Sequence, residues 1–208
     1  MGRRRSFLLS GCATIVLLLL VGCQATTSRT DGRLRIVAIT TIVADLARQL
    51  GGEAVAVTAL MGPGIDPHLY RASEGDVARM QQADLVLYNG LHLEGKMTEV
   101  FERMQALGRP TLAVAECVPD SLRLRASGFG GVYDPHVWMD VRRWQYAARC
   151  VAETLARMDT ARAAFYRDRL AAYLAELDST DAYVRRRSAT LPPERRVLIT
   201  SHDAFRYF

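Results

Sequence analysis

The chain has 208 residues, with 27 Lys and Arg against 22 Asp and Glu, which gives a formal net charge of +5. Arg3, Arg4 and Arg5 lie in a leader of 22 residues that has no acidic residue, so the chain after this leader carries only +2. That charge is too small for a nucleic-acid-binding surface, and we expect no nucleic acid partner.

The first 22 residues have the pattern of a secretory signal peptide. An apolar stretch runs from Phe7 to Val21, and "LVGC" ends it at Cys23. A basic start, a short apolar segment and small residues at the cut site are typical of export signals. The stretch is short for a membrane-spanning helix of about 20 residues. Cysteine at this place resembles a bacterial lipobox, which implies cleavage before Cys23 and lipid on its sulfur. A plain signal peptide and an uncleaved anchor are the alternatives.

We therefore predict a signal peptide at 1–22 and a lipidated, flexible tether at 23–33, whose residues are small and polar. The protein is then exported and anchored to the membrane by lipid at Cys23, facing the periplasm or the cell exterior.

Strands and helices alternate from Leu34 onward. Apolar or β-branched segments predict strands at 34–40, 54–61, 84–90 and 111–116, and apolar residues at helical spacing predict helices at 41–52, 73–83 and 96–107. This alternation predicts an α/β fold with a parallel, doubly wound sheet. Ligands of such sheets bind beyond the carboxyl ends of the strands.

An irregular connection is predicted for 117–135, followed by helices at about 141–158 and 160–189. The second helix has no Gly or Pro and ends before Pro192 and Pro193. At about 30 residues it would be about 45 Å long, which suits a rod between two lobes.

The predicted organisation is an N-terminal lobe at 34–158, a linking helix at 159–190 and the first strand of a second lobe at 191–208. The segment "RRVLIT" has the β-branched composition of a strand. Because the sequence ends at Phe208, where an α/β unit would continue, we expect it to be a fragment.

Two cysteines, Cys117 and Cys150, follow the leader and Cys23. An exported chain could oxidise them to a disulfide. Their spacing matches no metal or redox motif, and each lies in an apolar segment, so we predict ordinary buried, unpaired cysteines.

Two of the four histidines, His68 and His136, follow Asp-Pro. Proline restrains its own backbone and that of the residue before it, so little entropy is lost when the histidine binds a ligand. Asp66 and Asp134 could accept a hydrogen bond from the second imidazole nitrogen, as carboxylates near metal-bound histidine do, or they could cap the turn. The alternative for one motif alone is a turn in which the histidine has no function.

A third histidine, His202, falls at the carboxyl end of the predicted last strand. The wide spacing of His68, His136 and His202 fits a metal site assembled from separate loops. His92, in "YNGLHLEG", lacks the Asp-Pro frame, and we do not expect it to be a ligand.

Four segments in order, "LMGPGIDPHLY", "ADLVLYNGLHLEGKM", "YDPHVWMDVRRW" and "RRVLITSHDAFRYF", resemble the zinc and manganese solute-binding lipoproteins of ABC importers. The resemblance implies two α/β lobes joined by one long helix, of which these residues supply the first lobe, the helix and the start of the second lobe. It also implies that His68, His136 and His202 bind Zn²⁺ or Mn²⁺ as transported solute. A fourth, carboxylate ligand would come from the second lobe, beyond residue 208. The implied partner is an ABC permease, and the receptor is expected to be a monomer and not an enzyme.

Three imidazoles and one carboxylate suit Zn²⁺ well, whereas Mn²⁺ prefers more oxygen and binds the same ligands more weakly. The physiological metal is left open between the two. One alternative function is a three-histidine zinc hydrolase, with Asp66, Asp134, Asp140 or Asp203 as general base, although no H-E-x-x-H pattern is present. Another is a surface adhesin, which no residue supports directly.

Overall fold

The alternating pattern folds into a parallel sheet. The computed structural model describes residues 32–126 and 133–208. In these ranges the strand order is β2-β1-β3-β4, where β1 is Leu34–Ala38, β2 is Val55–Ala59, β3 is Leu85–Tyr88 and β4 is Thr111–Ala113. All three pairings are parallel. The predicted sheet is confirmed, although each strand is shorter than its predicted range.

The predicted signal peptide, Cys23 and the tether up to residue 31 lie outside the described residues. In the part of the chain that the structure describes, no helix combines the length and apolar character that a bilayer crossing requires.

The α-helices are α1 (Thr41–Gly51), α2 (Glu74–Gln82), α3 (Thr98–Ala106), α4 (Val141–Met158) and α5 (Ala163–Ala189). Three of them begin at a side chain that accepts a backbone hydrogen bond from the first turn: Thr40 for α1, Ser73 for α2 and Asp140 for α4. Such caps satisfy amide groups that have no partner within the helix.

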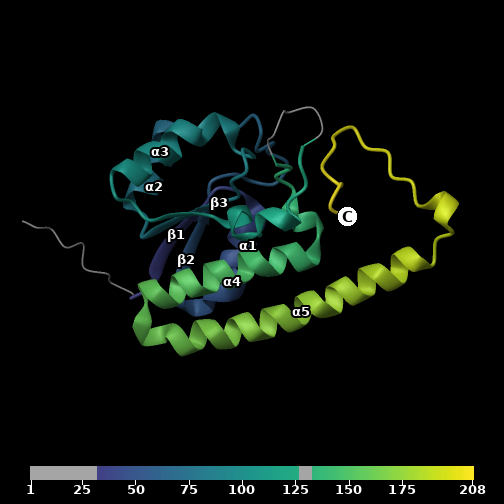
Figure 1. Ribbon diagram of the computed structural model, residues 1–208. Helices are drawn as coiled ribbons and strands as arrows, with labels where there is room; N and C mark the ends of the chain where they lie inside the picture. The colour runs from purple at the N-terminus through teal and green to yellow at the C-terminus, as the bar shows by residue number, and fades with distance from the viewer. Residues whose placement is uncertain (1–31, 127–132) are drawn as a thin grey trace, which may run out of the picture. The chain divides into compact units, whose positions relative to one another are not determined.

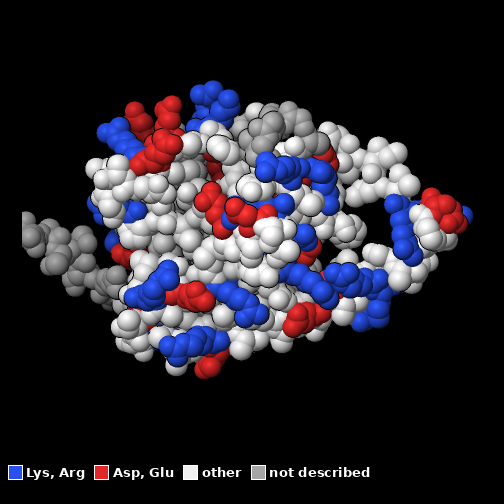
Figure 2. Space-filling view, in the orientation of Figure 1, with Lys and Arg blue, Asp and Glu red and all other residues white. Residues whose placement is uncertain are grey.

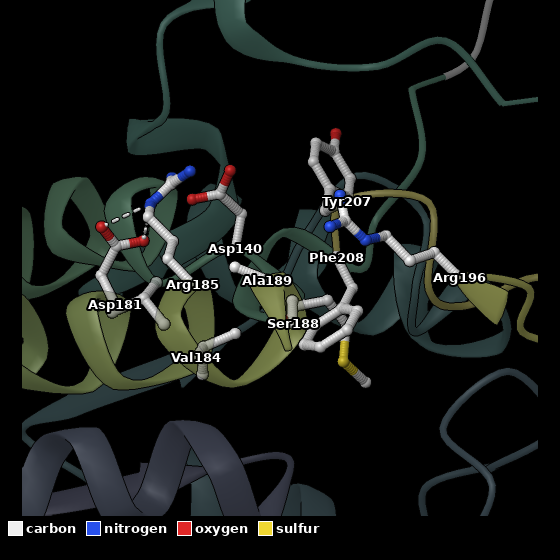
Figure 3. A pocket seen from close by; sticks show the side chains of 11 residues that line it. Asp140, Asp181, Val184, Arg185, Ser188, Ala189, Arg196, Tyr207 and Phe208 are labelled. Atoms are coloured by element: carbon white, nitrogen blue, oxygen red, sulfur yellow. Dashed lines mark hydrogen bonds and ion pairs between the residues drawn. The ribbon is translucent and has the colours of Figure 1, made fainter. Parts of the chain in front are cut away.

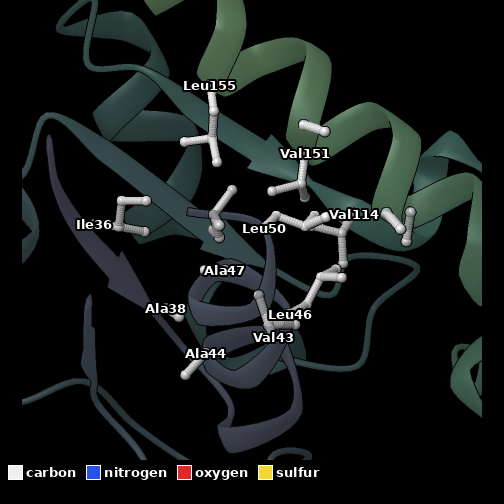
Figure 4. Packing of buried hydrophobic residues seen from close by; sticks show 14 of the residues in the cluster. Ile36, Ala38, Val43, Ala44, Leu46, Ala47, Leu50, Val114, Val151 and Leu155 are labelled. Carbon is white, nitrogen blue, oxygen red and sulfur yellow. The ribbon is translucent and has the colours of Figure 1, made fainter. Parts of the chain in front are cut away.

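Helices cover both faces of the sheet, with α1, α4 and α5 on one face and α2 and α3 on the other (Figure 1). On the first face, Leu46 and Leu50 of α1 pack with Val151 and Leu155 of α4 and with Ile36 of β1 (Figure 4). On the second face the buried cluster includes Val37, Val86, Met80, Phe101 and Met104. Neighbouring strand residues such as Ile36 and Val37 enter opposite cores because side chains alternate along a strand.

The long helix predicted for 160–189 is α5, preceded by a short 3-10 turn at Thr160–Arg162. Its 27 residues make it about 40 Å long. Tyr166 and Leu177 are buried against the rest of the fold, whereas Tyr183 near its carboxyl end is exposed. That this helix links two lobes stays a prediction.

Basic and acidic side chains are interspersed over α4 and α5 (Figure 2). Asp181 of α5 pairs with Arg142 of α4 at 3.0 Å and with Arg185 of its own helix at 2.9 Å. The two arginines are largely exposed, so these pairs contribute little to stability.

The strand predicted at the start of 191–208 is not formed, which corrects the sequence prediction for this segment. Val197, Leu198 and Ile199 are 72%, 60% and 91% exposed. A strand needs backbone partners, and no strand of the described fold pairs with this segment. Burial resumes only at Ala204 and Tyr207.

The prediction of two unpaired cysteines is also wrong. Cys117 and Cys150 form a disulfide, with their Cα atoms 6.2 Å apart. The bond joins the short 3-10 turn Val114–Cys117, just after β4, to α4. The turn and helix pack together through Val114, Ala147 and Val151, and this long-range packing, which neither segment encodes alone, brings the two sulfurs together.

Candidate metal centre

Three histidines from separate segments meet at one point. His136 Nε2 lies 3.3 Å from His68 Nε2 and 3.1 Å from His202 Nε2. All three ligand atoms lie within 4.8 Å of one another. Within residues 32–126 and 133–208, no other group of three His, Cys, Asp or Glu side chains is close enough to share an ion. The structure thus brings together the three residues that the sequence singled out.

Each histidine is supplied by a different loop. His68 lies between β2 and α2, His136 lies just before the 3-10 turn Val137–Met139 that leads into α4, and His202 lies in the segment after α5. His136 is buried, His68 is half-buried and His202 is exposed. The cluster is therefore accessible to solvent from the side of His202.

His92 is not part of this cluster. It follows β3 with an exposed side chain and lines a separate cavity of about 260 Å³ with Tyr88, Glu102 and Glu116. The structure therefore places His92 outside the histidine cluster, and its not being a ligand stays a prediction.

The two Asp-Pro-His motifs form the same turn. Asp66 Oδ1 accepts a hydrogen bond from the His68 backbone N–H at 2.9 Å, and Asp134 Oδ1 accepts one from the His136 N–H at 3.0 Å. Aspartate stabilises turns through such bonds to the backbone two residues on. The repeated motif therefore encodes a repeated backbone conformation that presents a histidine.

Only the second motif also orients the imidazole ring. Asp134 Oδ1 lies 2.8 Å from His136 Nδ1, and both side chains are buried. A carboxylate can only accept here, so Nδ1 carries a proton, and in the neutral imidazole Nε2 then keeps a free lone pair. That lone pair faces the other two histidines, which is the arrangement that a metal ligand needs.

The electrostatic environment favours the forms that bind metal. Burial raises the pKa of the Asp134 carboxyl, but hydrogen bonds from the ring and backbone of His136 outweigh it, so the net pKa is lowered. Burial lowers the pKa of His68, and the neighbouring His136 lowers it further. A lowered histidine pKa keeps the imidazole neutral at neutral pH, and only the neutral form binds a metal ion.

Comparison with known proteins assigns the chain to a family. Residues 36–208 match the family described as zinc-uptake complex component A, periplasmic. The chain belongs to this family. The resemblance inferred from the four sequence segments is therefore confirmed.

Several relatives of this chain have names that refer to metal binding. The chain is 46% identical over 178 residues to the zinc-binding protein TroA of Treponema pallidum, covering 86% of this chain and 57% of that one. It is 39% identical over 203 residues to the manganese-binding lipoprotein MntA of Bacillus subtilis, covering 98% and 63%. The chain thus spans about three fifths of the length of these relatives.

A solved structure confirms the fold. The periplasmic zinc-binding protein TroA from Treponema pallidum superposes with a TM-score of 0.81 at 46% identity, over 85% of this chain and 63% of that chain. The α/β fold that the sequence predicted, with a parallel sheet followed by a long helix, is therefore confirmed.

The sequence analysis missed a support that holds the His136 loop of this family member. Asn89, fully buried after β3, donates from Nδ2 to the carbonyl oxygens of Pro135 and Gly90, both at 3.0 Å. Glu94 in turn accepts from the Asn89 and Gly90 N–H groups at 2.8 and 3.1 Å, and burial raises the pKa of its carboxyl to about 7. The sequence signal for this role of Asn89 is the polar pair "NG" at the end of a predicted strand, because a residue at that place can contact a neighbouring loop.

Tyr207 was missed as well. It lines a cavity of about 490 Å³ between α5, the start of α4 and the C-terminal segment, together with Asp140, Arg185 and Arg196 (Figure 3). None of the three clustered histidines lines this cavity, but the Tyr207 hydroxyl contacts the His136 loop.

Proposed function

We propose that the protein is the extracytoplasmic receptor of an ABC importer, and that His68, His136 and His202 bind Zn²⁺ or Mn²⁺ as its cargo. The observation that carries the proposal is the convergence of three imidazole Nε2 atoms from three loops. Proteins rarely hold three histidine nitrogens this close without a function, because their lone pairs and any positive charge repel one another.

The spacing of the nitrogens supports a metal ion. A tetrahedral zinc ion with Zn–N bonds of about 2.1 Å holds its ligand atoms about 3.4 Å apart. The His136 Nε2 atom is 3.3 and 3.1 Å from its two partners. Small movements of His202, which is exposed, would complete the geometry.

The chemistry of the ligands ranks the two metals. Imidazole nitrogen suits Zn²⁺, whereas Mn²⁺ prefers oxygen and follows lower in the affinity order for divalent ions. We therefore propose that zinc binds more tightly, while the metal that is transported depends on availability outside the cell. The relatives, one named for zinc and one for manganese, support the same pair of metals.

The proposed location follows from the leader. The "LVGC" segment and the naming of relatives as lipoproteins support lipid attachment at Cys23 and a position outside the cytoplasmic membrane. The proposed partner is the permease of the importer, and the receptor is proposed to act as a monomer.

The arrangement of three of the four candidate aspartates, Asp66, Asp134 and Asp140, argues against a zinc hydrolase. A general base must be free to accept a proton from metal-bound water. Asp134 already binds the ring and backbone of His136, Asp66 binds the His68 backbone, and Asp140 caps α4. A binding role explains these carboxylates without an additional reaction.

Isothermal titration calorimetry of the purified protein with Zn²⁺ and Mn²⁺ tests the proposal. His68→Ala and His136→Ala are each expected to weaken zinc binding at least tenfold, about 1.4 kcal/mol. His92→Ala is the matched control and is expected to bind as the wild type does. Equal losses in His92→Ala and His68→Ala, or wild-type affinity without His136, would refute the assignment.

A further inference from the structure

Tyr207 joins the segment that carries His202 to the loop that carries His136. Its side chain is buried, with 6% of its surface exposed. The hydroxyl donates a hydrogen bond to the Asp134 carbonyl oxygen at 3.0 Å and accepts one from the Leu124 N–H at 2.9 Å. The Tyr207 hydroxyl therefore acts both as a donor and as an acceptor, and the two bonds together fix its position.

The ring of Tyr207 is held in place as well. The guanidinium carbon of Arg143, in the first turn of α4, lies 5.1 Å from the ring centroid. A cation over an aromatic face at this distance is attractive. The neighbouring Arg206 donates to the Arg125 carbonyl oxygen at 2.6 Å. Contacts from two directions thus attach this part of the chain to the first lobe.

His202 lies between this attachment and a segment without burial. Val197, Leu198 and Ile199 before it are exposed, whereas Ala204 after it is buried. The His202 carbonyl oxygen accepts from the Ala204 N–H at 2.9 Å and from the Thr200 hydroxyl at 2.7 Å. The buried part of the fold is therefore reached from His202 on its carboxyl side, where Tyr207 is attached.

The same hydroxyl also restrains His136. The carbonyl oxygens of Asp134 and Pro135, the two residues before His136, accept from Tyr207 and Asn89 respectively. Together with the Asp134 side chain, which binds the His136 ring and N–H, these bonds leave the His136 loop few alternative conformations. Tyr207 is the member of this set that also belongs to the His202 segment.

We propose that Tyr207 is a positioning residue of the metal site, setting the distance between His136 and His202 through its hydrogen bond to the Asp134 carbonyl. The inference rests on the proposed function, because it assigns a role within the same site. A metal ion binds more tightly when its ligands are already close together, since less conformational entropy is then lost. Groups that orient metal ligands without touching the metal typically change affinity by about 10- to 100-fold.

The test removes the hydroxyl of Tyr207 and, as a control, the hydroxyl of another buried tyrosine, and compares the zinc affinities of the two variants. Tyr207→Phe keeps the ring and its packing and removes only the two hydrogen bonds. Tyr166→Phe is the control, because Tyr166 is also buried and its hydroxyl donates to Asp159 at 2.9 Å, next to the turn between α4 and α5. Tyr207→Phe is expected to weaken zinc binding about tenfold in calorimetry, whereas Tyr166→Phe leaves the affinity within about twofold.

A spectroscopic reading and a double-mutant cycle separate positioning from general stability. Co²⁺ bound in place of zinc should show altered visible absorption in Tyr207→Phe and an unchanged spectrum in Tyr166→Phe. Because Tyr207 is proposed to set the distance between His136 and His202, the loss caused by Tyr207→Phe should be smaller in the His202→Ala background than in the wild type. Fully additive losses, or equal affinity losses in the two tyrosine variants, would overturn the proposal.

The outcomes distinguish this inference from the proposed function. If the wild type binds zinc and His136→Ala does not, while Tyr207→Phe binds as the wild type does, only the positioning role fails. If the wild type itself shows no histidine-dependent binding, the proposed function fails first.

Discussion

Replacing Asp134 with asparagine isolates what a carboxylate contributes to the proposed metal site. Asp134 Oδ1 is the acceptor for both the ring Nδ1 and the backbone N–H of His136, at 2.8 and 3.0 Å. Asparagine keeps the size and one acceptor oxygen, but it removes the negative charge that strengthens both bonds and holds the proton on Nδ1. The tautomer with its proton on Nδ1 is then less populated, so His136 Nε2 less often has a free lone pair for a metal ion.

The expected loss is large because the pair is buried. The side chains of His136 and Asp134 are 6% and 4% exposed, so water molecules cannot take over the hydrogen bonds that the charged carboxylate made to His136. Loss of a carboxylate that orients a metal-bound histidine typically weakens metal affinity by about 10- to 100-fold, which corresponds to about 1.4–2.7 kcal/mol. We expect Asp134→Asn to fall in this range for zinc.

Asp66→Asn provides the matched control within the same motif. Asp66 is exposed and binds the backbone N–H of His68, and an asparagine oxygen can accept that bond equally well. Its zinc affinity should change less than about threefold, in line with the small value of exposed charges. Calorimetry at neutral pH measures both variants, and nitrogen-15 NMR of the imidazoles reports the His136 tautomer. Similar losses in the two variants, or wild-type affinity in Asp134→Asn, would refute the reasoning.

The same substitution changes the response to acid. The pKa of Asp134 is lowered in the folded protein, so its contribution to stability is present above the unfolded value of about 3.9 and is lost as pH falls through the folded value. Urea unfolding measured at descending pH should show this acid-dependent loss in the wild type and a smaller one in Asp134→Asn. An identical pH dependence in both proteins would contradict the assigned interaction.

Two further predictions concern the cysteines. The Cys117–Cys150 bond closes a separation of 33 residues, so the double variant Cys117→Ser/Cys150→Ser should have a free energy of unfolding lower by about 3–4 kcal/mol. The zinc affinity of this variant should stay unchanged, because neither sulfur belongs to the histidine cluster. A urea midpoint equal to that of the oxidised wild type would contradict the stability prediction. Cys23→Ser should leave the protein without lipid and release it from the membrane fraction of expressing cells, whereas retention wholly in the membrane pellet would point to an uncleaved anchor.

Local sequence was enough to predict the elements that carry the site. Strands and helices were found from apolar spacing, and the parallel sheet followed from their alternation. The Asp-Pro-His motifs were informative because their physics is local: proline restrains the backbone, and aspartate binds the amide two residues on. His68 and His136 could therefore be singled out, and His202 was added because it falls at the carboxyl end of a predicted strand; the family resemblance implied the same three residues.

Contacts between distant segments could be decided only by the tertiary structure. The apolar run Val197, Leu198 and Ile199, with two β-branched residues, predicted a strand, but a strand forms only where a partner strand is available. Cys117 and Cys150 pair because the turn after β4 packs against α4. Tyr207 reaches Asp134 across 73 positions of sequence. Each of these depends on which surfaces meet in space, and the residue types of a single segment do not contain that information.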